Sequence, residues 1–114
     1  MTLKRVNEST ILFPELSRAQ TPWARAIGLL RHKGLSSKEA LWITKCWAIH
    51  TFFMRFAIDC VFVNRKGTVV KVYHDLKPWR LAGPVWGATD VIEMAAGQAR
   101  EKNIRVGDIV ECGP

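Results

Sequence analysis

The strongest constraint on the fold is a long run of alternating residues in the middle of the chain. Every even position in this run is apolar: Phe52, Met54, Phe56, Ile58, Cys60 and Phe62. Side chains with a period of two lie on one face of an extended strand, so the run predicts a β-strand with one face in a core. A strand of this length usually bends or changes partner, and we expect a break near Phe56 and Ala57.

The sequence after this run predicts further short strands. Residues 64–67, Asn-Arg-Lys-Gly, suit a tight turn, and residues 68–76 alternate again, which together indicate an antiparallel hairpin. We expect strands at 89–96 and 109–112, with a short helix at 97–102 that ends at a left-handed Asn103. Residues 76–87 contain two prolines, two glycines and two tryptophans and therefore predict an irregular connection.

The N-terminal half predicts fewer regular elements. Residues 9–13, which are followed by Pro14, favour a first strand near a sheet edge. Thr21 followed by Pro22 is typical of a helix start, and Gly28 would end that helix after about two turns. Residues 40–47 are again β-prone. With 114 residues, the chain predicts one compact domain over 1–114, a mainly β, antiparallel sandwich or barrel with two short helices.

The composition excludes several classes of protein. Apolar residues make up 48% of the chain and charged residues 24%, which is typical of a folded domain and not of a disordered one. The stretch from Cys46 to Met54 lacks charge but is far shorter than the roughly 20 residues of a membrane-spanning helix. The basic residues near Met1 are not followed by an apolar segment, so we expect no secretion signal and a cytoplasmic protein.

The three cysteines favour a reducing compartment, because Cys46, Cys60 and Cys112 cannot all pair and form no Cys-x-x-Cys motif. Together with His50 they would reach the four ligands of a zinc site, but such sites usually begin from two close ligands two to four residues apart, and no two cysteines are that close. We therefore expect no metal and no cofactor, and interpret Cys60 as a small buried hydrophobic residue.

The positive charge is concentrated in the first half of the chain. Residues 1–57 hold nine basic and three acidic residues (+6), and residues 58–114 hold eight and seven (+1). Basic residues at this wide spacing usually form a solvated surface, which is the favoured interpretation. The alternative is a nucleic-acid-binding face, with Trp23, Trp42 or Trp47 stacking on bases; it requires those tryptophans to be exposed.

Several motifs resemble one known family. They are Gly28-Leu29-Leu30, the run from Ile49 to Asp59, Lys77-Pro78-Trp79-Arg80, Ala96-Gly97 and Val106-Gly107-Asp108. Over about residues 21–110 the chain resembles the bacterial and archaeal domain of unknown function 192. The resemblance implies a compact, mainly β fold and no established activity, cofactor or partner. Ala57 stands where the family commonly has proline.

The pattern and the resemblance single out one collection of chemically capable side chains: His50, Thr51, Arg55, Asp59, Trp79 and Arg80. One interpretation is structural: Asp59 accepts hydrogen bonds from the backbone or from an arginine, and Arg55 could be its partner in a pair that fixes strand register. The other is a small concave site in which Arg55 or Arg80 holds a carboxylate or phosphate, Trp79 forms a wall, and the remaining polar groups add contacts.

These observations favour a non-catalytic binding or accessory module for a small anionic ligand or an acidic segment of a partner protein. Nucleic-acid binding is the alternative. A hydrolase or transferase is the third hypothesis and the least supported, because adjacent strand residues such as His50 and Thr51 point to opposite faces. The sequence also contains no phosphate-binding glycine loop and no known catalytic motif.

Overall fold

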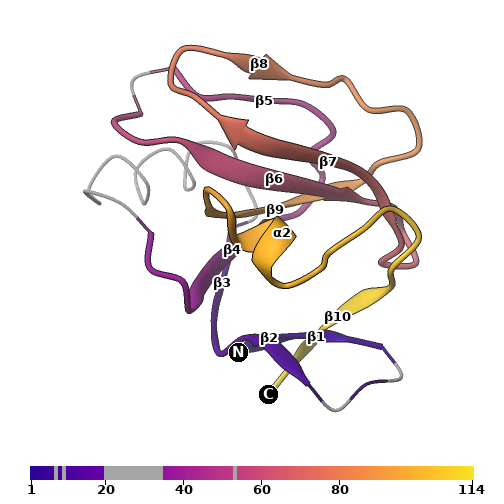
Figure 1. Cartoon of the computed structure of the whole chain (residues 1–114). Coiled ribbons are helices and arrows are strands. Elements are labelled where there is room, and N and C mark those ends of the chain that lie inside the picture. Colours follow the sequence, from indigo (N-terminus) through magenta and orange to yellow (C-terminus); the bar gives the residue numbers. More distant parts are fainter. Residues whose placement is uncertain (7, 9, 20–34, 53) are drawn as a thin grey trace.

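The computed structural model describes residues 1–6, 8, 10–19, 35–52 and 54–114, and shows a compact, mainly β domain (Figure 1). The strands are β1 (Thr2–Arg5), β2 (Ile11–Phe13), β3 (Glu15–Ala19), β4 (Glu39–Ile43), β5 (Ile49–His50), β6 (Ile58–Val63), β7 (Val69–Leu76), β8 (Leu81–Ala82), β9 (Asp90–Ala95) and β10 (Val110–Gly113), and α2 (Gln98–Glu101) is a short helix. The helix expected from Thr21 lies outside the described residues. None of the helical residues described forms a segment long and apolar enough to cross a membrane.

Three sheets form layers. The central sheet has the order β3-β4-β9-β6-β7, a second sheet has the order β10-β1-β2, and β5 pairs with β8 alone. Figure 1 shows the β5–β8 pair at one end of the molecule and the β10-β1-β2 sheet at the other. All pairings are antiparallel except β3–β4, which is parallel. The expected antiparallel architecture is therefore confirmed in the main and corrected at this one edge.

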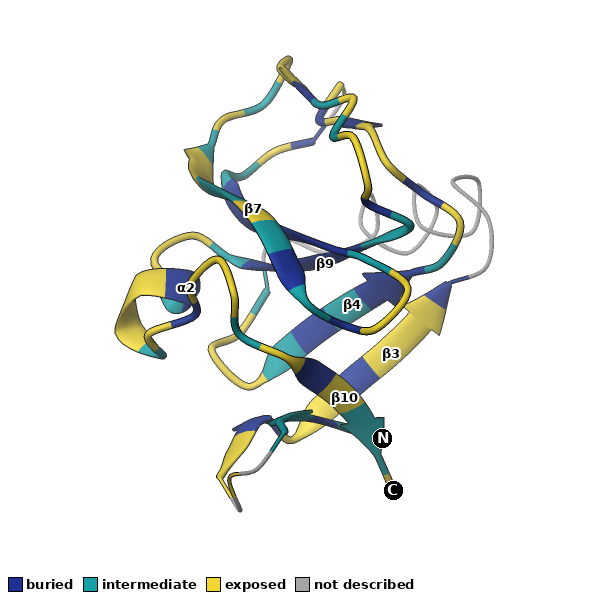
Figure 2. Ribbon diagram, turned by 90° about the vertical axis from the view of Figure 1, so that its right-hand side faces the viewer, coloured by how far each residue is buried: buried dark blue, intermediate teal, exposed yellow. Residues whose placement is uncertain are grey.

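The strands β6 and β9 in the middle of the central sheet are buried on both faces, because each face of the sheet covers its own core. Alternate residues of β6 divide between the two: Val61 and Val63 join one cluster, and Cys60 and Phe62 join the other. The first core is closed by the β10-β1-β2 sheet and α2, and the second by the residues around β5 and β8. Figure 2 shows buried residues along β4 and β9 and exposed residues along β3 and the outer loops. The expectation of a single buried face for this strand is wrong.

The long alternating run is not one strand. Of its apolar positions only Ile58, Cys60 and Phe62 lie in a strand, β6. The described residues between β5 and β6 (51, 52 and 54–57) belong to no strand, so an interruption near Phe56 is confirmed, but the strand expected before it is absent from these residues. The β6–β7 hairpin, β9, the short helix and β10 also lie where the sequence predicts them. Cys60 is fully buried, as expected.

Two strands, β1 and β3, were not predicted from the sequence. Each has few buried residues to mark it: Leu3 alone in β1, and Leu16 and Ala19 in β3. Both strands are held by pairing with distant segments, β1 with β10 and β3 with β4. As a result β2, expected to be the first strand, is the second, although its place at a sheet edge is confirmed.

The helix α2 is attached to the sheets by Lys102, which follows its last residue. The ammonium group lies 3.8 Å from the centre of the Phe13 ring and donates hydrogen bonds to Gln98 Oε1 and to the Ser37 carbonyl. Burial lowers the pKa of Lys102, and the nearby Glu101 carboxylate partly opposes that shift. A cation that pairs with carbonyls and a ring thus closes this side of the first core.

Candidate binding surface

Asp59 occupies a buried position in β6 and serves the backbone. Its Oδ1 accepts a hydrogen bond from the Asp75 N–H at 2.8 Å, and its Oδ2 accepts one from the Ala99 N–H at 2.9 Å. The first bond holds Asp75 in a left-handed conformation (φ 52°), and the second satisfies an N–H in the first turn of α2, where no side chain of the helix itself acts as a cap. Asp59 therefore joins β6, β7 and the helix.

The structure contains no ion pair between Arg55 and Asp59. The salt bridges among the described residues all involve Arg5, and both oxygens of Asp59 bind backbone N–H groups instead. Arg55 lies in the irregular segment before β6 and is exposed. The structural interpretation is therefore confirmed in one part, since Asp59 accepts backbone hydrogen bonds, and wrong in the other, since Arg55 is not its partner.

Thr51, just after β5, is fully buried and fastens the 77–80 loop. Its hydroxyl donates to the Lys77 carbonyl at 2.6 Å and accepts from the Arg80 N–H at 2.8 Å. Its backbone N–H donates to the Arg80 carbonyl at 2.9 Å, and its own carbonyl accepts from the Trp79 N–H at 3.0 Å. One buried threonine thus fixes the path of the loop at three successive points.

This clamp holds Trp79 in a conformation that bulky residues rarely adopt. Its φ is 64°, in the left-handed region, which costs about 1–2 kcal/mol for a residue with a Cβ. The ring is 56% exposed and stacks on Phe52, with centroids 5.7 Å apart and an interplanar angle of 26°. The strain therefore places a large apolar ring where solvent can reach it.

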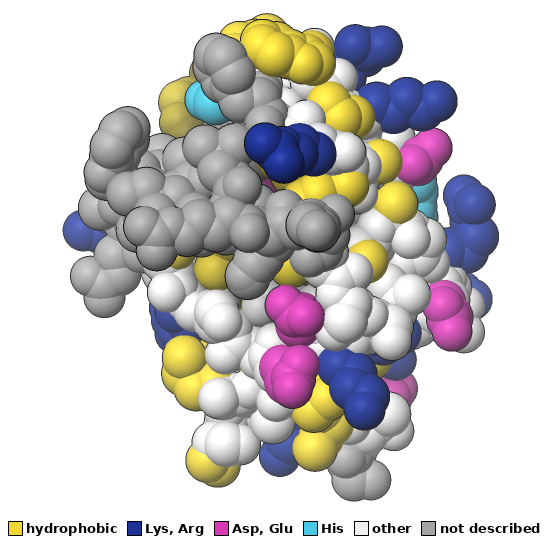
Figure 3. Space-filling model, turned by 90° about the vertical axis from the view of Figure 1, so that its left-hand side faces the viewer, with side chains coloured by type: hydrophobic (Ala, Val, Ile, Leu, Met, Phe, Trp, Pro, Cys, Tyr) yellow, Lys and Arg dark blue, Asp and Glu magenta, His cyan; other side chains and the backbone are white. Residues whose placement is uncertain are grey.

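Phe52 extends the row toward His50. Their ring centroids are 4.8 Å apart, and the Phe52 N–H donates to His50 Nδ1 at 3.3 Å. His50 faces Leu81 directly in the β5–β8 ladder, and Leu81 is 70% exposed. We call His50, Phe52, Trp79 and Leu81 the aromatic surface. Figure 3 shows hydrophobic side chains gathered at this end of the molecule, with Lys and Arg side chains nearby.

Basic residues flank the aromatic surface. Lys77 and Arg80 belong to the clamped loop, Arg55 follows Met54 in the chain, and all three are exposed. The Arg80 guanidinium makes only long contacts, 3.4–3.5 Å, with carbonyls of its own loop. None of the three forms an ion pair with a described residue. Their charge is therefore directed to solvent.

Of the six candidate residues, the structure brings together His50, Thr51, Trp79 and Arg80. Thr51 lies beneath the surface and positions the loop, whereas the other three face solvent. Asp59 belongs to the sheet and its helix contact. Phe52 and Leu81 were not among the predicted site residues. The alternating run assigned Phe52 to the core. Its stacking on Trp79 depends on the position of the 77–80 loop, which the sequence does not show.

The tryptophans of the nucleic-acid alternative divide between core and surface. Trp42 is buried, and its indole N–H donates to Asp90 Oδ2 at 2.6 Å. Trp47 is 45% exposed and packs edge-on against Trp86, with ring centroids 5.3 Å apart. Trp23 lies outside the described residues. Stacking of bases on Trp42 is thus excluded by its burial.

Two solved structures have the same fold as this chain. A small, mainly β domain with this arrangement of sheets is found in a crystal structure of a protein of unknown function from Novosphingobium aromaticivorans, with a TM-score of 0.81, 20% identity, and 98% of this chain and 84% of that chain covered. A Sinorhizobium meliloti protein provisionally described as a transcription regulator superposes with a TM-score of 0.75 at 18% identity, over 84% of this chain and 79% of that one. At these identities the likeness shows the fold alone.

The family follows from the sequence itself. The model of the DUF192 family, described as "Uncharacterized ACR", matches residues 3–112, and the chain belongs to this family. A UPF0127 protein of Pyrococcus abyssi is 43% identical over 63 residues. That match covers 55% of this chain and 53% of the relative, so the chain spans about half the length of this curated relative. The family resemblance expected from the motifs is confirmed, and the family has no established activity.

Proposed function

We propose that this protein is a non-catalytic binding module whose aromatic surface holds an acidic segment of a partner protein. The observation that supports it is the row of exposed rings, His50, Phe52 and Trp79, together with the exposed cations Lys77 and Arg80 in the same clamped loop as Trp79. Exposed large apolar side chains that gather in one place commonly mark an interaction site. Tryptophan and arginine are also the residues most enriched among energetic hot spots of protein interfaces.

The chemistry favours an acidic and partly apolar occupant. Apolar side chains of the occupant would cover Phe52 and Trp79, while its carboxylates would meet Arg55, Lys77 and Arg80 at the rim. Arginine can bind a carboxylate through two parallel hydrogen bonds, and complementary charge speeds association and fixes orientation. Because Thr51 holds the loop rigidly, little conformational entropy is lost on binding.

The test is a titration with a labelled synthetic peptide of alternating glutamate and leucine, followed by fluorescence anisotropy. We expect Trp79→Ala to weaken binding at least about tenfold, since loss of a central hot spot costs about 2 kcal/mol or more. Trp86→Ala is the matched control, because Trp86 is also highly exposed (80%) but packs on Trp47 outside the aromatic surface. Equal losses in the two variants would contradict the proposal.

The same titration separates the alternatives. A lysine and leucine peptide should bind far more weakly, and weakening of the acidic peptide by Arg80→Ala should persist at higher salt. Tighter binding of a single-stranded oligonucleotide, lost in Trp47→Ala and unaffected by Trp79→Ala, would overturn the proposal in favour of a nucleic-acid-binding protein.

A further inference from the structure

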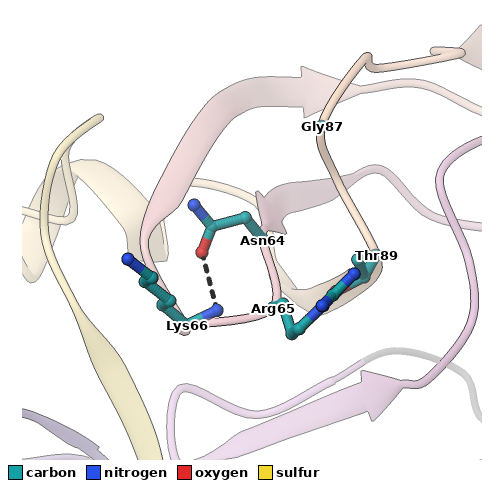
Figure 4. Close-up of a pocket in the computed structure, with 5 residues that line it drawn as sticks. All are labelled: Asn64, Arg65, Lys66, Gly87 and Thr89. Atoms are coloured by element: carbon teal, nitrogen blue, oxygen red, sulfur yellow. Dashed lines mark hydrogen bonds between the residues drawn. The ribbon is translucent and has the colours of Figure 1, made fainter.

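We infer that a second site, separate from the aromatic surface, binds the phosphate group of a small molecule. A hollow of about 360 Å³ lies between the β6–β7 turn and the segment that leads into β9. It is lined by Asn64, Arg65, Lys66, Gly87 and Thr89 (Figure 4). This volume falls within the roughly 300–1,000 Å³ of small-molecule sites, and no residue of the aromatic surface lines it.

The lining is positively charged and rich in hydrogen-bond donors. Arg65 and Lys66 are both exposed, neither forms an ion pair with a described residue, and the lining contains no acidic side chain. Figure 4 shows Arg65 extending toward Thr89, while the side chain of Lys66 leaves the turn on the other side. A guanidinium can bind a phosphate through two parallel hydrogen bonds, so Arg65 is the contacting cation, and Lys66 contributes positive charge at longer range.

The β6–β7 turn that carries these cations is fixed by hydrogen bonds. Asn64 Oδ1 accepts from the N–H groups of Lys66 and Thr68, at 2.9 and 3.0 Å, and the Gly67 N–H donates to the Asn64 carbonyl at 2.9 Å. Gly67 has φ 82°, and a Cβ there would collide with the Val110 carbonyl oxygen. The positions of Arg65 and Lys66 are thus set before any ligand arrives.

Gly87 and Thr89 line the side of the hollow opposite the β6–β7 turn. The Thr89 N–H donates to the Val63 carbonyl at 2.9 Å, and the Thr89 carbonyl accepts from the Cys46 N–H at 2.7 Å, so the backbone of this half-buried lining residue is held in place. At Gly87 an added Cβ would meet nothing within 4 Å, so the hollow is open at that point. A phosphate held by Arg65 and Thr89 would therefore leave room for the group that it esterifies.

The test is a titration followed by amide shifts in two-dimensional ¹H–¹⁵N NMR spectra at constant ionic strength. The probes are inorganic phosphate, glycerol 3-phosphate and acetate. We expect saturable shifts confined to residues 64–67 and 87–89 with both phosphates, tighter binding of the ester, and no saturation with acetate. Unchanged shifts elsewhere will show that each variant is folded.

The variants assign the site. We expect Arg65→Ala to weaken binding of glycerol 3-phosphate about tenfold, Thr89→Val a few-fold, and the Arg65→Ala, Lys66→Ala double variant most of all. The matched control is the Lys77→Ala, Arg80→Ala double variant, which removes the same charge from the aromatic surface and should leave phosphate binding within about twofold.

Equal weakening by the two double variants, scattered shifts, or acetate binding as tight as phosphate binding would overturn the inference. The acidic peptide provides the converse measurement, because its binding should depend on Lys77 and Arg80 and not on Arg65. Failure at one site is therefore distinguishable from failure at the other.

Discussion

The central sheet and the β5–β8 end use polar side chains in opposite ways. In the sheet, the Asp59 carboxylate is buried and both oxygens accept hydrogen bonds from the backbone of other elements. At the β5–β8 end, the strands are only two residues long, and exposed rings and cations surround a single buried clamp, Thr51. Polar residues that the sequence groups together thus separate into those that hold the fold and those that face solvent.

The comparison also shows where strain is tolerated. Asp75 and Trp79 both adopt a left-handed backbone, and each is held there by a buried polar residue, Asp59 in the first case and Thr51 in the second. In the sheet the strained residue lies beside the carboxylate that joins β7 to α2. At the β5–β8 end the strained residue, Trp79, presents an exposed indole that stacks on Phe52.

The largest expected effect is that of Asp59→Ala on the sheet. Two buried N–H groups would lose their acceptors, at about 1–3 kcal/mol each, so the free energy of unfolding should fall by about 3 kcal/mol in urea denaturation. Arg55→Ala is the control and should change it by less than about 0.5 kcal/mol. Similar losses in the two variants would indicate that the two residues act as a pair after all.

The next largest effect concerns the clamp. Thr51→Val keeps the shape but leaves the Arg80 N–H and the Lys77 carbonyl without the hydroxyl, which should cost about 2 kcal/mol. Tryptic cleavage after Arg80, followed by mass spectrometry, should become faster, while Thr51→Ser should stay close to the original chain. A Val variant with unchanged cleavage would show that the loop is held by other contacts.

The sequence predicted much of the sheet because local chemistry marks it. The 64–67 turn, the alternation on either side of it and the glycine before α2 each specify local backbone geometry, and the elements formed where expected. By contrast, β1 is recognisable only through its pairing with β10, more than a hundred residues away. Such pairing leaves no periodicity in a four-residue segment.

Four of the six candidate residues lie near one another in the structure. His50, Thr51, Trp79 and Arg80 do converge, because β5 pairs with β8. That Asp59 accepts backbone hydrogen bonds was one of the predicted possibilities, but its donors on β7 and α2 could not be identified from the sequence. The role of Phe52 could not be predicted, because this residue continues a core-like alternation onto an exposed end. Alternation in the sequence shows which residues share a face of a strand, whereas tertiary packing determines whether that face is buried.

A smaller effect tests whether the strain at Trp79 serves binding. Trp79→Gly and Trp79→Ala both remove the ring, but only glycine relieves the left-handed backbone, so the Gly variant should be more stable by about 1 kcal/mol in urea denaturation. Both should lose the acidic peptide to the same extent. A Gly variant less stable than the Ala variant would mean that the loop backbone is not strained in solution.

The smallest effects concern local opening, which the three cysteines report by their rates of alkylation. Half-buried Cys112 should react first, although burial raises the pKa of its thiol, an effect that the Arg18 guanidinium at 3.6 Å partly opposes. Because the folded pKa of Cys112 is raised above that of a free thiol, less thiolate is present at a given pH, and the alkylation rate should keep rising at pH values where that of a free thiol has levelled off.

The two buried thiols compare the two regions directly. Cys46 lies just before β5 and Cys60 in the middle of β6, and both belong to the core between them. A two-residue ladder should open more readily than a strand paired on both sides, so native-state iodoacetamide labelling, read by mass spectrometry, should modify Cys46 several-fold faster than Cys60. The Thr51→Val substitution should increase the labelling rate of Cys46 and leave that of Cys60 unchanged. Equal rates for the two thiols would mean that the sheet and the β5–β8 end open together, and the aromatic surface would then be as rigid as the core beneath it.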